Sequence, residues 1–126
     1  MFKVYQIQVP REQFDAVNEL GWSEAMEKFP AVEAHMACTM KGSEGFVSEA
    51  HSQFYSHVCN IDASDLEDVF RIGNIGPEEA IERLAPMHSV SVGDIVVDDK
   101  GDAFIVDSFG FERVELTFRK CRGMLA

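Results

Sequence analysis

The sequence predicts an α+β fold: an antiparallel sheet of four to five strands with helices packed on one face. Three observations lead to this prediction. Apolar and polar residues alternate near the N-terminus and again around Tyr55, as in half-buried strands. Helical spacing and capping residues occupy most of the first two-thirds of the chain. The last third holds apolar runs separated by glycine-containing turns, which predicts a C-terminal β-meander.

The N-terminal part, residues 1–53, is expected to contain one strand followed by helices. Alternation over residues 5–9 predicts the strand, which ends at Pro10. A helix over residues 10–20 follows and stops at Gly21. Ser23 is the expected N-cap of a second helix, and Trp22 is expected to pack where the two helices meet.

A third helix is expected after Pro30, with Gly42 as its cap. The glycine- and serine-rich segment 41–53 is the best candidate for a mobile loop.

The part over residues 54–118 is expected to supply most of the sheet. Residues 54–62 predict a strand with Tyr55, His57, Cys59 and Ile61 on one face. A capping box at residues 64–67 begins a helix that Gly73 ends, and residues 77–85 predict another short helix.

The meander comprises apolar runs at residues 94–98 and 103–108 and a strand at residues 114–118. Residues 99–101 join the first two runs, with glycine at the left-handed position, and residues 109–111 allow the second bend.

The chain has 126 residues, which fits a single domain over 1–126, and a net charge of −11. So acidic a surface repels phosphate backbones and disfavours direct nucleic-acid binding. Two explanations of the charge remain open: solubility, and mimicry of nucleic acid by carboxylates that take the place of phosphates.

We expect a cytoplasmic protein without a membrane segment. No apolar run approaches the roughly 18 residues of a membrane helix, and the N-terminus lacks the pattern of a signal peptide. The 3 cysteines are widely spaced, which favours reduced thiols over a disulfide framework.

Motifs of common enzymes are missing: no nucleophile elbow, phosphate loop, zinc-protease helix or dinucleotide fingerprint occurs. No cofactor is therefore expected. A small metal protein or enzyme stays open as an alternative, because two imidazoles and two thiols could form a tetrahedral site. The same spacing also follows from core packing; the residues are His35, Cys38, His57 and Cys59.

Residues 106–111, Val-Asp-Ser-Phe-Gly-Phe, place an acid and a hydroxyl at the end of a strand. In one account Asp107 or Ser108 bonds its own backbone in a turn, Gly110 supplies a positive φ and both phenylalanines are core. In the other, Phe109 or Phe111 is exposed beside the acid as a binding contact.

Two motifs resemble the YodL-like domain, a family that recurs in proteins of plasmids, phages and integrative elements. They are residues 89–96, SVSVGDIV, and residues 106–111, VDSFGF. Upstream, Phe70 and Asn74 are similar to a phenylalanine and an asparagine that adjoin in the family. Gly93 stands where the family has serine, and Ile105 where it has tyrosine. The resemblance covers the C-terminal half and supplies no catalytic residues.

The resemblance implies an accessory protein of a mobile element that binds a protein rather than catalysing a reaction. A host defence component is one possible partner. The outermost strand could also pair with a second copy to form a homodimer. The expected binding residues are Asp94, Asp107, Ser108, Phe109 and Phe111.

Overall fold

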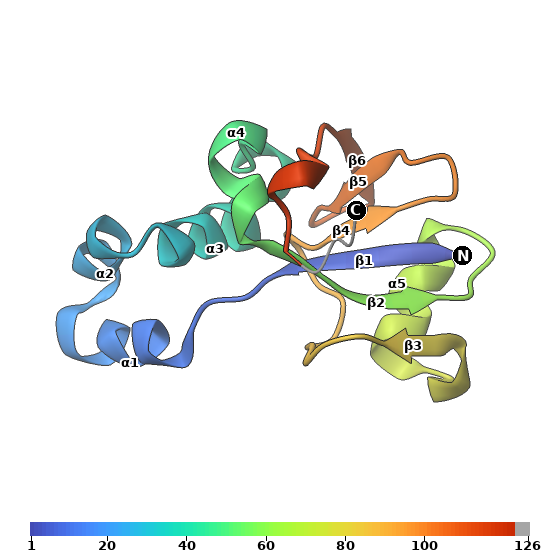
Figure 1. Cartoon of the computed structure of the whole chain (residues 1–126), viewed down its shortest axis with the longest axis horizontal. Coiled ribbons are helices and arrows are strands. Elements are labelled where there is room, and N and C mark those ends of the chain that lie inside the picture. The colour runs from blue at the N-terminus through green and yellow to red at the C-terminus, as the bar shows by residue number, and fades with distance from the viewer. Residues whose placement is uncertain (123–126) are drawn as a thin grey trace.

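The computed structural model describes residues 1–122, and over this range the fold is α+β with a six-stranded antiparallel sheet (Figure 1). The expected single domain over 1–126 therefore extends beyond the described residues. The sheet has one or two strands more than predicted. Its order is β3-β2-β1-β4-β5-β6, and the strands are β1 (Phe2–Ile7), β2 (Tyr55–Ile61), β3 (Ile81–Arg83), β4 (Ile95–Val97), β5 (Ala103–Val106) and β6 (Phe111–Val114).

The meander is confirmed, since β4, β5 and β6 are consecutive antiparallel neighbours. The predicted bounds of its third strand, 114–118, are wrong: β6 ends at Val114, and Phe118 begins a 3₁₀ turn. Gly101, with a φ of 87°, lies in the β4–β5 turn, as its sequence position predicts. The strands around Tyr5 and Tyr55 join the meander, with β1 between β2 and β4.

The prediction of a helix over residues 77–85 is wrong. Only Glu78–Ala80 forms a single 3₁₀ turn, and residues 81–83 pair with β2 as the edge strand β3. Ile81 packs, partly buried, against the core from this strand, whereas Leu84 is exposed. Pairing with β2 therefore favours a strand over a helix at residues 81–83.

Helices cover both faces of the sheet, whereas the sequence predicts helices on one face only. Tyr5 packs with α3 (Pro30–Lys41), and the neighbouring Val4 packs with α5 (Leu66–Ile75). Because successive side chains of a strand point to opposite faces, these are two separate cores. We call the two sides the α3 face and the α5 face.

A β-bulge in β2 changes which residues share a face. The register shifts between Val4, which pairs with Cys59, and Tyr5, which pairs with His57, so Val58 is the extra residue. His57 therefore lies on the α3 face with Tyr5, while Cys59 packs on the α5 face with Val4. The prediction that His57 and Cys59 share a face is wrong for this reason.

The other helices are α1 (Arg11–Leu20), α2 (Trp22–Lys28) and α4 (Ser48–His51). The helix α1 follows the prediction, and α1 and α2 lie beyond the end of the sheet (Figure 1). The helix α2 begins directly after Gly21 and therefore includes Ser23, which is not its N-cap. Trp22 is 43% exposed, so it is not packed between helices as expected. Within residues 1–122 we find no helix with the length and hydrophobicity that crossing a membrane requires.

Segment 41–53 is not an extended loop but contains a 3₁₀ turn, α4 and part of a second 3₁₀ turn. His51 holds the segment together: its Nδ1 accepts the Val47 N–H at 2.9 Å, and its Nε2 lies 3.0 Å from Glu33 Oε1. Ser52 is also buried and accepts the Thr117 N–H at 3.0 Å. The glycines of the segment therefore allow tight turns and a close approach of the backbone to the core.

The helix α5 begins one residue later and ends three residues later than predicted. Asp65, not Ser64, is the N-cap, because its side chain accepts the Asp68 N–H at 2.8 Å. The helix runs through Gly73 to a C-cap at Gly76, whose φ is 103°. Gly73 is needed for packing: a Cβ there would lie 2.3 Å from a methyl carbon of Val90.

Candidate functional site

The turn between β5 and β6, together with the first residue of β6, carries four of the five residues that the sequence predicts as a binding site. It closes with a hydrogen bond of 2.9 Å from Asp107 N–H to the Gly110 carbonyl. Gly110 has a φ of 77°, so the expected role of this glycine in the bend is confirmed.

One account of the motif expects the Asp107 carboxylate to accept a hydrogen bond from its own backbone, but no such bond forms. Its two oxygens instead accept the N–H of Ser43 at 2.7 Å and the hydroxyl of Ser43 at 2.8 Å. Ser43 lies just after α3, in the 3₁₀ turn that begins at Gly42. A Cβ at Gly42 would lie 1.9 Å from Asp107 Oδ1, so glycine is required for this approach.

The two phenylalanines of residues 106–111 have different environments. Phe109 is 97% exposed, and Phe111 is half-buried against the core of the α5 face. Ser108 directly precedes Phe109 in the sequence and is exposed. The structure thus has one core phenylalanine and one exposed phenylalanine, next to an acid whose position is fixed.

Further apolar side chains surround the turn. A pocket of about 380 Å³ between the turn and the end of α3 includes Met40, which is 69% exposed. On the other side, a pocket of about 240 Å³ lies between the turn and α5, with Phe70 at its wall. We name this region the β5–β6 surface; it consists of Met40, Phe70, Asp107, Ser108 and Phe109.

Sequence reasoning missed Met40, Phe70 and Ser43 as members of this site. Phe70 stands in the motif that resembles the YodL-like domain, and its place there is the one signal that could have indicated it. Met40 and Ser43 come from the end of α3, more than 60 positions before the turn. Nothing local in the sequence links these residues to Asp107.

Asp94, the fifth predicted residue, belongs to a different place. Its side chain is buried, and its Oδ2 accepts N–H groups from Gln6 at 3.0 Å and Ser91 at 2.9 Å. Burial raises the pKa of Asp94 to about 7, although His88 and the two N–H donors act in the opposite direction. The five predicted residues therefore do not form one site.

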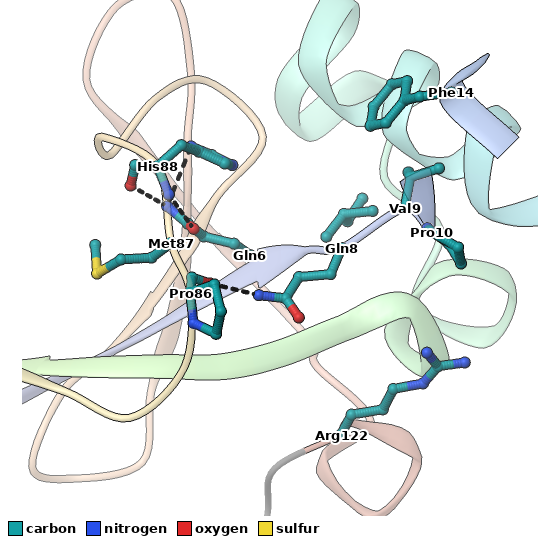
Figure 2. A pocket seen from close by; sticks show the side chains of 10 residues that line it. Gln6, Gln8, Val9, Pro10, Phe14, Pro86, Met87, His88 and Arg122 are labelled. Carbon is teal, nitrogen blue, oxygen red and sulfur yellow. Dashed lines mark hydrogen bonds between the residues drawn. The ribbon is translucent and has the colours of Figure 1, made fainter. Parts of the chain in front are cut away.

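The Gln6 side chain, which the sequence analysis did not single out, organises the region around Asp94. It is fully buried, donates to the His88 carbonyl at 2.9 Å and accepts the His88 N–H at 3.2 Å. The neighbouring pocket of about 560 Å³ is shown in Figure 2, where Phe14 and Met87 approach it from opposite sides.

The four residues of the metal alternative are not brought together. Cys38 lies 3.7 Å from His51 Nδ1, and His35 packs edge-on against Phe14. His57 stacks on Tyr5, across the sheet from Cys59. Burial raises the pKa of Cys38 and of Cys59 to about 11, so both are protonated thiols at neutral pH.

More generally, in the part of the chain that the structure describes, no three His, Cys, Asp or Glu side chains are arranged to hold a metal ion. Comparison of the chain with protein-family models, curated proteins and solved structures finds no match. The likeness to the YodL-like domain therefore depends on the motif residues alone.

Proposed function

We propose that this chain is a non-enzymatic protein-binding module whose contact surface is the β5–β6 surface. The observation that supports this best is the exposure of Phe109, at 97%, on a turn held by the Asp107–Ser43 hydrogen bonds. Aromatic side chains dominate the energetics of protein interfaces because they bury a large apolar area with few rotatable bonds.

The fixed turn strengthens this argument. A contact residue on a mobile loop loses conformational entropy on binding, at a cost of about 0.5–1.5 kcal/mol for each immobilised side chain. Here Gly110 and the Asp107 carboxylate already hold the backbone on both sides of Phe109. The partner that fits is a protein with an apolar pocket for one aromatic ring and polar groups at its rim.

The cellular setting that we propose is the cytoplasm of a bacterium that carries a mobile element. Its support is the resemblance of residues 89–96 and 106–111 to the YodL-like domain. A host protein, including a component of defence, or another protein of the element would be the partner.

Mimicry of nucleic acid is not favoured by a specific observation. Exposed carboxylates occur on elements throughout the described chain, from Glu12 in α1 to Glu112 in β6. Several are paired with basic side chains, as Glu78 is with Arg83 at 2.5 Å.

The experiment is an affinity capture from a bacterial lysate with the whole chain as bait, analysed by mass spectrometry. The bait is used as wild type, as Phe109→Ala and as Ile75→Ala. Ile75 is the matched control because it is 84% exposed at the end of α5, outside the β5–β6 surface.

A protein that the wild type and Ile75→Ala capture, and that Phe109→Ala does not, would support the proposal. Equal capture by all three baits would refute the β5–β6 surface as the contact. Sedimentation of the bait alone separates a homodimer from a complex with another protein. Added DNA that displaces the captured protein would instead indicate mimicry.

A further inference from the structure

A second site lies beside β1, where the sheet opens. The strand β4 pairs with β1 only at Lys3–Tyr5. Beyond Tyr5, the segment over residues 86–93 occupies that side of β1 and is held by the buried Gln6. An inner cavity of about 200 Å³ forms between this segment, β1 and α3.

The inner cavity adjoins the larger pocket of Figure 2. Both are lined by Ile7 and His88, and the larger pocket adds the apolar side chains of Val9, Phe14 and Met87. Gly93, which has a φ of 95°, allows the close approach to α3, because a Cβ there would lie 2.9 Å from the Cys38 carbonyl. The inner cavity is thus polar around Asp94, and the adjoining larger pocket has an apolar wall.

Asp94 is the polar group at the inner end. Its side chain is only 6% exposed, and both of its hydrogen bonds go to Oδ2. Among residues 1–122 no hydrogen bond reaches Oδ1, although a carboxylate can accept several. An ionised carboxylate at this depth is unfavourable unless a cation compensates it.

Two imidazoles, those of His35 and His88, line the inner cavity. His88 Nδ1 lies 2.7 Å from the Ser89 carbonyl, so this nitrogen carries a proton and donates to that oxygen. Burial lowers the pKa of His35, and the nearby His88 lowers it further, so His35 is neutral at physiological pH. The inner end thus combines one carboxylate with two imidazoles.

We propose that this cavity binds the ammonium or guanidinium group of a small organic cation, with the ligand's apolar part along Val9, Phe14 and Met87. The cation would donate to Asp94 Oδ1 and place a permanent positive charge beside this carboxylate. The net charge of −11 attracts cations to the protein as a whole. This site is separate from the β5–β6 surface, and neither proposal depends on the other.

Ionisable groups on several elements face Asp94, and all affect its charge. His88 Nδ1 lies 4.0 Å from Oδ2, and His35 lines the same cavity from α3. Tyr55 and Cys59 of β2 also interact with the Asp94 charge, and burial raises the pKa of both. None of these four supplies a permanent positive charge, and Arg122 lines the outer pocket rather than the inner cavity.

The test uses three ligands of the same shape and different charge: benzylamine, benzyl alcohol and benzoate. Each is titrated into the ¹⁵N-labelled whole chain, and amide shifts are followed by NMR. We expect benzylamine to shift the amides of His88, Gly93 and Asp94 in a saturable way. Benzyl alcohol and benzoate should bind at least about tenfold more weakly, since a charge-assisted hydrogen bond is lost.

Asp94→Asn is the matching variant, because its side-chain oxygen can still accept from Gln6 and Ser91. It should weaken benzylamine binding about tenfold, whereas Glu112→Gln, which removes one exposed charge from β6, should not. In the wild type, benzylamine stays cationic while its affinity falls as Asp94 is protonated below about pH 7.

Three results would overturn the proposal. One is a spectrum that benzylamine leaves unchanged in this region. Another is equal binding of the three ligands, and the last is unaltered benzylamine affinity in Asp94→Asn. The pH series on the wild type provides an answer even if the variant folds poorly.

Discussion

The carboxylate of Asp107 accepts both the backbone N–H and the hydroxyl of Ser43, at 2.7 and 2.8 Å. The two residues are 64 positions apart, so this pair joins the end of α3 to the turn between β5 and β6. It fixes the backbone that presents Phe109. Its removal should therefore affect the stability and the order of two segments at once.

Asp107→Ala should lower the free energy of unfolding by about 1–2 kcal/mol, because a part-buried N–H and a hydroxyl lose their acceptor. Amide hydrogen exchange at Ser43 should become faster in the same variant. Ser108→Ala is the control, since Ser108 is exposed and next in the chain. Unchanged exchange at Ser43 would contradict the importance of the pair.

Gly42→Ala should destabilise the protein by about 1–3 kcal/mol, because the φ of 56° is strained for alanine and the new Cβ meets Asp107 Oδ1. Part of this cost should disappear in the double variant with Asp107→Ala, where the clashing oxygen is absent. Urea unfolding of the two single variants and the double variant measures the coupling. Strictly additive effects would show that the clash is relieved in another way.

Phe109→Ala should change the free energy of unfolding by less than about 0.5 kcal/mol, because the side chain contacts little in the folded chain. Phe111→Ala should cost about 1–3 kcal/mol, because Phe111 packs against the core of the α5 face. Loss of partner binding in Phe111→Ala would therefore not identify a contact residue. Thermal unfolding of both variants checks this difference, and similar values for the two would contradict it.

The stability of the wild type should depend on pH through Asp94. Its pKa is about 7 in the folded state and about 3.9 in the unfolded chain, so the folded state binds the proton more tightly. This contribution is complete below about pH 4 and is lost as the pH rises to about 7. Asp94→Asn lacks this loss, so its stability relative to wild type should rise by about 2–4 kcal/mol between pH 4 and pH 8. Parallel pH profiles for the two proteins would contradict the shift.

The sequence predicts those parts of the fold that local patterns control. The β4–β5 hairpin follows from apolar runs on either side of a glycine turn, and α1 follows from its spacing between Pro10 and Gly21. Strand β3 could not be predicted in this way, because three residues are too few to show the apolar–polar alternation of a strand. The bulge at Val58 could not be predicted from the local sequence either, because it depends on the register between β2 and β1.

In the candidate site, too, only the features that local sequence controls could be predicted. Gly110 and the bend before Phe111 follow from turn chemistry. The exposure of Phe109 does not, because the same motif fits a core phenylalanine. The environment of Asp94 depends on Gln6, 88 positions earlier, whose burial contradicts the usual exposure of glutamine.

The place of β1 in the middle of the sheet has a consequence for biosynthesis. A ribosome makes this strand long before its neighbours, since β2 begins at Tyr55 and β4 at Ile95. Until both have emerged, the rows of peptide groups along β1 have no partners and can pair with strands of other nascent chains. Polysomes that translate this message at high density should therefore need chaperone protection until the segment near Val97 has left the exit tunnel.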